Sequence, residues 1–546
     1  MIIKEWDIWN SNLTYFIYEI KNLENIAESL VDNELCTLVC HSNGNVWWKD
    51  ENRVESGIIK TEKKEYRKSD INIPKKLKKS EYLSNNANIA ALMRFDELII
   101  FKKEYLDSFS YIRGYINSCY MEKDGKTIVL YPQIKLYNNG VMEVSFRIEL
   151  LKSENEPPKY EIDDFIEKLV NIVEQKVDRI GVPQKLAILE AKFRLEPTIK
   201  DKWKIWDFRF KNSIDEENQL IFKNTEKVEE RDLIYPMTYL DDISKYDFYI
   251  KNLDIITRFI ISSVEYIIKK TENKHNYTNL KWINRPSVYI TDFEDLTNSS
   301  IETIEKYKVD IAKILARNTY GNFKDLNIIL GDDLRFYKDY NFFVSYGLSL
   351  VVYSKIKQDE VMKDNPTNRF IFEKQVQIES INYLYMCHKR IAEKSSLLSI
   401  PYEPVLEGML NVLKLDSMTK GVTKFLELNN TYSFVDKILK WDEERKYANE
   451  MLDIRAKITN ERKNEDFKVL GLMVTVIFGL IGASTFVSNV TIPIWKHFNL
   501  WLPATGEIST GINQVFLFVI TAVLIIILIF SLFLVIKRFR KEIKIT

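Results

Sequence analysis

Cysteine, histidine, glycine and proline are all scarce in this chain. Its 546 residues include four histidines and four cysteines, Cys36, Cys40, Cys119 and Cys387. Cysteines at such irregular spacing exclude a disulfide framework and a paired-cysteine zinc site, and they indicate a reducing compartment. With 16 Gly, 13 Pro and 46% hydrophobic residues, the chain is neither low-complexity nor disordered.

The chain also lacks net charge, and we expect no secretory signal. Its 78 Lys+Arg balance 78 Asp+Glu, whereas a general nucleic-acid binder carries a basic excess that neutralises phosphates. We therefore expect no direct binding of nucleic acid. Glu5 and Asp7 stand where a signal peptide needs an apolar run. The length allows about three domains at roughly 150 residues each.

Motifs for catalysis are missing as well. The sequence has no phosphate-binding loop, no glycine-rich dinucleotide turn and no H-E-x-x-H helix. Acidic pairs such as Asp163-Asp164 could bind a regulatory cation, although carboxylates at a helix start also interact favourably with the helix dipole. We name no catalytic residue and no metal ligand, and we predict that the protein is not an enzyme.

One segment is strongly basic. Residues 60–79 hold nine basic and three acidic side chains. The weak candidates for a ligand-binding site are its four last lysines, Lys75, Lys76, Lys78 and Lys79. They could attract a phosphorylated ligand or an anionic lipid. A solvated loop is the alternative.

Hydrophobic periodicity outlines the larger N-terminal part. Asn138-Asn139-Gly140 between two alternating apolar runs predicts a β-hairpin, because Asn-Gly readily adopts positive φ. Apolar residues at helical spacing predict helices over residues 249–270, 301–315 and about 364–394. We divide the chain into a strand-rich region 1–155, an α/β to α-helical region 156–400, a helical stalk 401–467 and a membrane domain 468–546 with a basic tail.

Two long runs near the C-terminus carry no charge. Residues 469–490 and 515–536 each contain 22 uncharged residues, enough for a helix of about 33 Å across a hydrocarbon core of roughly 30 Å. They predict a two-span hairpin in the cell membrane, in contact with lipid. Basic residues precede the first run and follow the second run. Because basic residues stay on the cytoplasmic side of a membrane, we expect both termini in the cytoplasm.

A highly charged segment precedes the first run. In residues 440–468, 16 of 29 side chains are charged, with both signs interleaved. We expect a solvated, coiled-coil-like stalk helix that runs unbroken from about Thr431 into the first run. The predicted fold is an α+β cytoplasmic body, followed by this long stalk helix and a two-helix transmembrane hairpin.

The first run has one face of small and polar residues. The pore-lining candidates on this face are Thr475, Gly479, Gly482, Thr485 and Asn489. Such a face either lets helices approach closely or lines a water-filled path. A path requires several subunits, with this run inside and the second run outside. In such an assembly the Asn489 side chains of the subunits would form a ring of amides. The alternative role of Asn489 is to cap the end of the run.

The order and spacing of these features in residues 431–546 resemble the CorA family of divalent-cation channels. The family's Gly-Met-Asn signature corresponds here to Val487-Ser488-Asn489, which retains the asparagine only. The resemblance implies a homopentameric ion channel, with a divalent cation such as magnesium as the associated ion.

The body before residue 431 is larger than CorA transporters need. In this it is similar to a CorA-like subgroup found beside type III CRISPR systems. That subgroup implies a ligand-gated antiviral effector, controlled through its cytoplasmic body by a nucleotide second messenger, an S-adenosylmethionine–AMP conjugate. The alternatives are a magnesium transporter and a membrane-anchored binding scaffold.

Overall fold

A computed structural model describes most of the chain. The described residues are 1–50, 53–65, 68–107, 109–150, 159–196, 204–240, 252–272, 280–364, 369–397, 400, 402–419, 426–497, and 513, 515, 516, 519, 520 and 523. They belong to two compact units, Met1–Met451 and Leu452–Thr546.

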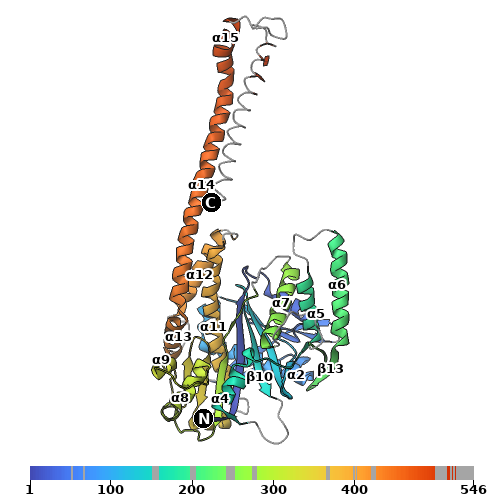
Figure 1. Ribbon diagram of the computed structural model, residues 1–546, viewed down its shortest axis with the longest axis vertical. Coiled ribbons are helices and arrows are strands. Elements are labelled where there is room, and N and C mark those ends of the chain that lie inside the picture. The colour runs from blue at the N-terminus through green and yellow to red at the C-terminus, as the bar shows by residue number, and fades with distance from the viewer. Residues whose placement is uncertain are drawn as a thin grey trace. The chain divides into compact units, whose positions relative to one another are not determined.

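The first unit is built on a mixed 16-stranded sheet (Figure 1). Its main path is β13 (Thr225–Glu230), β14 (Leu233–Tyr239), β12 (Arg179–Pro183), β8 (Cys119–Lys123), β9 (Lys126–Tyr137), β10 (Val141–Leu150), β1 (Ile2–Tyr15), β16 (Ser287–Phe293), β18 (Ser349–Tyr353) and β17 (Tyr340–Val344). Beside this path pair β2 (Leu38–His41), β3 (Asn45–Asp50), β4 (Arg53–Ile58), β7 (Tyr111–Tyr115), β11 (Tyr160–Glu161) and β15 (Ile283–Asn284). A separate two-stranded sheet contains β5 (Lys60–Glu65) and β6 (Lys68–Asn72).

Helices follow or separate these strands along the chain. In the first part of the chain they are α1 (Leu23–Asp32), α2 (Glu81–Ile100), α3 (Lys103–Leu106), α4 (Ile162–Phe165), α5 (Gln184–Leu195), α6 (Lys204–Lys223) and α7 (Leu253–Glu272). Later come α8 (Ser300–Ala316), α9 (Leu326–Leu330), α10 (Lys355–Asp364), α11 (Arg369–Ser396), α12 (Tyr402–Thr419), α13 (Leu426–Leu439), α14 (Trp441–Phe486) and α15 (Ile492–His497). The helices α7, α8 and α11 confirm the three helices predicted from periodicity.

The predicted Asn-Gly hairpin is confirmed. Strands β9 and β10 pair antiparallel around it, with Leu136 opposite Met142. Gly140 has φ +90°, a conformation that L side chains rarely adopt. A Cβ atom at this position would also lie 2.7 Å from the carbonyl oxygen of Tyr18. The turn therefore requires glycine for two reasons.

Replacing Gly140 with alanine should destabilise the protein by about 2 kcal/mol, because positive φ and a contact with backbone both penalise a Cβ atom. Chemical denaturation measures the loss. Gly125→Ala is the matched control, since Gly125 has φ +73° but open space around it. It should lose only about 1 kcal/mol. Equal losses for the two variants would contradict the close approach at Gly140.

One face of the sheet is apolar. Alternate residues of the central strands, such as Ile134 and Val144, join a single buried cluster with residues of α1, α5, α7 and α8. Figure 1 shows α5 and α7 on this side of the sheet. Burial of apolar area at about 25 cal/mol per Å² is the main force that holds these helices in place.

The opposite face is polar. It carries Arg113 of β7, Lys135 of β9 and Glu143 of β10, all buried. Helix α11 lies along this face, in contact with β1, β10 and β16, and also packs against α2, α12 and α13 (Figure 1). Because α11 has neighbours on several sides, most of its polar side chains are buried with its apolar ones. This interface is unlike an ordinary protein core, which excludes charge.

The predicted stalk is helical but not continuous. Helix α13 ends at Leu439, and Lys440 adopts φ +55° before α14 begins at Trp441. The prediction of an unbroken helix from Thr431 is therefore wrong at this residue. From Trp441 onward the helix runs to Phe486, where a π-helical turn (Val487–Thr491) follows.

The membrane hairpin is not found. Among the residues that the structure describes, no helix combines the length and the apolar character needed to cross a bilayer. The first uncharged run is not a helix of its own, because α14 has already begun in the charged segment before it. The second run lies outside the described residues apart from isolated positions. The predicted fold with its two-helix hairpin, and the two-span cell-membrane location inferred from it, are therefore wrong; the observed architecture is a mixed α/β sheet protein.

Candidate functional site

Two cations lie side by side under α11. Arg113 of β7 and Lys135 of β9 are directly paired in the sheet register, and both side chains are almost fully buried. Moving such charges out of water costs several kcal/mol for each ion unless an opposite charge is close. Within the sheet Glu143 lies opposite Lys135, but the carboxylates that form ion pairs with the two cations come from outside the sheet.

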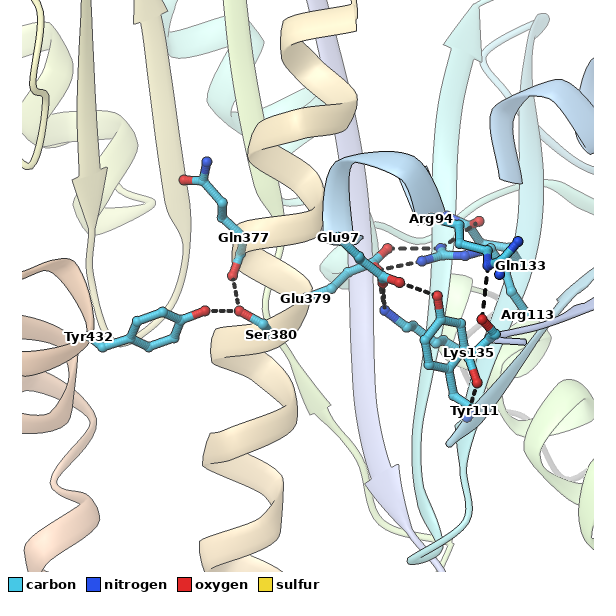
Figure 2. A network of polar contacts seen from close by, with 11 residues as sticks. Arg94, Glu97, Tyr111, Arg113, Gln133, Lys135, Gln377, Glu379, Ser380 and Tyr432 are labelled. Carbon is cyan, nitrogen blue, oxygen red and sulfur yellow. Dashed lines mark hydrogen bonds and ion pairs between the residues drawn. The ribbon is translucent and has the colours of Figure 1, made fainter. Parts of the chain in front are cut away.

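The compensating carboxylates come from two helices (Figure 2). Glu379 of α11 accepts hydrogen bonds from Arg113 at 2.9 Å and 2.5 Å, and from the Lys135 ammonium at 2.9 Å. Glu97 of α2 accepts from Lys135 at 2.8 Å and also from the Tyr111 hydroxyl. We call Glu97, Arg113, Lys135 and Glu379 the charge network. It contains two positive and two negative groups and joins both helices to the sheet.

The network strongly perturbs its members. Burial opposes the ionisation of Glu379, but Arg113 and Lys135 outweigh it and lower its pKa to about 2. Burial likewise opposes the charge on Lys135, yet Glu379 and Glu97 raise its pKa. For Tyr111, burial and Glu97 together raise the pKa, so its hydroxyl stays protonated and donates. Arg113, Lys135 and Glu379 are thus ionised throughout the physiological range.

A further buried acid lies next to this network. Burial, and then the charge of Glu379, raise the pKa of Glu143 to about 7. Its carboxylate accepts a hydrogen bond of 3.2 Å from Asn382 of α11, and the Asn382 amide oxygen accepts one of 2.9 Å from Arg285. Burial lowers the pKa of Arg285 to about 10. Glu143 is therefore a group that titrates near neutral pH inside the sheet–α11 interface.

The other side of α11 contacts the helices that follow it. The hydroxyl of Ser380 donates to the carbonyl of Gln377 at 2.8 Å, so the Tyr432 hydroxyl of α13 is the donor in its bond to Ser380. Figure 2 shows Glu379 directed to the sheet and Ser380 directed to Tyr432, on opposite sides of the helix. Adjacent residues of α11 thus bind two different parts of the first unit.

The start of α14 is also held by α11. The rings of His388 and Trp441 stack at 5.5 Å, and Lys389 forms an ion pair of 2.8 Å with Glu444. Together with Ser380 and Tyr432, these residues form what we call the α11 joint. A shift of α11 on the sheet would therefore change the contacts of α13 and of the beginning of α14.

The charge network joins α11 to the sheet through buried ion pairs. Within the described ranges, no group of three or more His, Cys, Asp or Glu side chains is placed to hold a metal ion. The four cysteines are buried, and burial raises their thiol pKa where a shift is resolved, as at Cys36. Buried ion pairs have discrete partners, so α11 has few positions at which every charge is compensated.

The residues predicted from sequence lie elsewhere. The four lysines Lys75, Lys76, Lys78 and Lys79 are exposed at the short helical turn before α2, and Lys76 pairs with Glu55 at 2.9 Å. Thr475, Gly479, Gly482 and Thr485 lie in α14, and Asn489 lies in the π-helical turn after it. The Thr475 hydroxyl donates to the carbonyl of Gly471 at 2.9 Å, within its own helix.

Sequence reasoning missed the charge network. The signal was present in β9 and β10, where Gln133, Lys135, Glu143 and Arg147 alternate with apolar residues. Alternation of this kind normally indicates a strand with one face in water. What distinguishes this face is the long segment 369–396, which is polar on several sides and has no single apolar stripe. Such a helix can be buried only against a polar surface.

Comparison of the chain with models of protein families, with curated proteins and with solved structures gives no significant match. The resemblance to the CorA family therefore remains a prediction from residue order and spacing.

Proposed function

We propose that this protein is a ligand-controlled effector. In it the sheet holds α11 in one of two positions, and a change of position moves α13 and the start of α14 with it. One observation carries the proposal: Glu379 and Ser380 are neighbours on α11, and they bind the charge network on one side and Tyr432 of α13 on the other. Control by a ligand also fits the resemblance described above.

The ligand we propose is of the nucleotide type, as the CorA-like subgroup implies. A ligand changes the balance between two positions of α11 only if it binds one of them more tightly. Reversing a 1:99 population to 99:1 takes a difference in affinity of about 10⁴-fold. The ligand supplies this difference through contacts that it makes in only one position of α11.

Titration of the intact protein with the S-adenosylmethionine–AMP conjugate tests this proposal. Binding is measured by calorimetry, and the α11 joint is monitored by the fluorescence of Trp441, which the Trp441→Phe variant identifies among the other tryptophans. We expect binding to change the emission of Trp441, because its ring stacks on His388 of α11. AMP and S-adenosylmethionine are titrated separately to show which part of the conjugate is needed.

A variant of the joint separates binding from response. Ser380→Ala removes the acceptor of the Tyr432 hydroxyl, so we expect the conjugate to bind within about threefold of wild type while the Trp441 response falls by half or more. Ser396→Ala is the control, because within the described part of the chain its exposed hydroxyl bonds only to the carbonyl of Glu393 in α11. Binding without any response at Trp441 in the wild-type protein would contradict the effector and favour a binding scaffold.

A further inference from the structure

A small cavity opens on the polar face of the sheet beside the start of α11. Its volume is about 70 Å³. Its lining comes from β1, β7, β9, β10, α2, α11 and the β13–β14 turn, and it includes Trp9, Tyr82, Tyr115, Tyr131, Glu230 and Phe372. No residue of the charge network as defined above lines this cavity.

Three lining residues have a buried polar atom without a hydrogen-bond partner among the described residues. These atoms are Nε1 of Trp9, the hydroxyl of Tyr115 and Oε1 of Glu230. The three residues are 2%, 7% and 8% exposed. Each unpaired buried polar atom lowers the stability of the folded protein by about 1–3 kcal/mol. Three such atoms in residues around one cavity therefore indicate that a molecule with hydrogen-bonding groups binds there.

The chemistry of these atoms defines the occupant. The indole N–H of Trp9 can only donate, whereas Oε1 of an ionised Glu230 can only accept. The other carboxylate oxygen of Glu230 is already used, since it accepts from the Ser118 hydroxyl at 2.5 Å. The occupant must therefore offer an acceptor to Trp9 and a donor to Glu230.

The side chains that line the cavity also indicate the shape and the charge of the ligand. The aromatic rings of Tyr82, Tyr131 and Phe372 favour a flat group that stacks on them or meets their edges. The charged lining residues balance, with Arg147 and Arg231 against Glu149 and Glu230, so an uncharged group is favoured over an anion or a cation. The cavity volume is enough for a few waters or for the edge of a ring.

We propose that this cavity binds the hydrogen-bonding edge of an uncharged planar carboxamide or amino-substituted nitrogen ring. The edge places an acceptor at Trp9 and an N–H at Glu230, and the rest of the ring lies at the opening among the aromatic side chains. The binding of this ring does not depend on the proposed function. Only its expected effect on α11 rests on that function. Phe372 belongs to α11, so the occupant contacts the helix that the effector is proposed to move.

Nicotinamide and adenine are the probes, and benzoate is the anionic control. Titration of the intact protein is followed by calorimetry and by the ¹⁵N–¹H signal of the Trp9 indole, assigned with Trp9→Phe. We expect both probes to bind in the millimolar range or tighter and to shift the Trp9 signal, and benzoate to bind at least tenfold more weakly. The waters-only alternative predicts no binding of any of the three.

Tyr115→Phe is the decisive variant. Among the described residues its hydroxyl has no partner to lose, so we expect a melting temperature equal to or above that of the wild type, and binding of both probes about threefold to tenfold weaker. Ser349→Ala is the matched control, because it removes an unpartnered buried hydroxyl of β18 that does not line the cavity. We expect it to leave binding unchanged.

Two results would overturn the assignment: no binding of either probe to the wild-type protein, or binding that neither shifts the Trp9 signal nor weakens in Tyr115→Phe. Probe binding at Trp9 upholds it whatever happens at the α11 joint. A failure of the proposed function appears separately, as an unchanged Trp441 emission when the S-adenosylmethionine–AMP conjugate is bound.

Discussion

Replacing Glu379 with glutamine is expected to lower the free energy of unfolding by about 3–5 kcal/mol, because it leaves a buried cation without its partner. Glu379 bonds both Arg113 and Lys135, and only Lys135 has a second carboxylate, that of Glu97, in the charge network. Glutamine keeps the size of the side chain, so the loss reports charge and not a cavity. Urea denaturation measures it.

A paired substitution separates the charge network from simple packing. Arg113→Met combined with Glu379→Met removes one charge of each sign and leaves Lys135 with Glu97, so we expect the double variant to regain at least half of the loss. Glu305→Gln, at an exposed position of α8, is the control and should change stability by less than about 0.5 kcal/mol. A loss below about 1 kcal/mol for Glu379→Gln would contradict the network.

Raising the pH from 5 to 8 is expected to cost the protein stability through Glu143, and Glu143→Gln is expected to abolish that cost. The folded state raises the pKa of Glu143 from 4.5 to about 7. Folding therefore favours the protonated carboxyl, so the stability that it contributes is present below pH 4.5 and is lost as pH rises through 7. A shift of this size corresponds to about 3 kcal/mol.

The groups that face Glu143 decide how the effect is tested. Burial and Glu379 raise its pKa, while Ser11, Lys135 and Asn382 oppose the rise. We expect Glu143→Gln to be about 3 kcal/mol more stable than wild type at pH 8 and nearly equal to it at pH 4.5. Thermal unfolding across this range measures the difference, with Glu305→Gln again as control. If Glu143→Gln is no more stable than the wild type at pH 8, the ionised carboxylate of Glu143 is stabilised by its neighbours and the prediction is wrong.

The sequence predicted the parts of the fold that local signals determine. The turn at Gly140 and the helices α7, α8 and α11 follow from turn chemistry and periodicity. The pairing of Arg113 with Glu379 joins residues that are far apart in the chain, and no local pattern encodes such a contact. A polar strand face looks the same in sequence whether water or a polar helix covers it.

The helical segment after α12 shows a second limit. The charged composition correctly predicted a long helix, which begins at Trp441. The break before it was not predictable, because Lys440 adopts positive φ without being glycine or asparagine, the residues that usually mark such a position. Absence of charge over 22 residues likewise did not establish a membrane span, because no helix among the described residues is both long and apolar enough to cross a bilayer.

Hydrogen–deuterium exchange of the intact protein, with and without the S-adenosylmethionine–AMP conjugate, tests the central claim most directly. If α11 is the element that moves, the conjugate should change the exchange of residues 369–396, 426–439 and 441–451 together, and Ser380→Ala should reduce the change in the last two segments. A change confined to the ligand's surroundings, with α13 and the start of α14 exchanging as before, would contradict it.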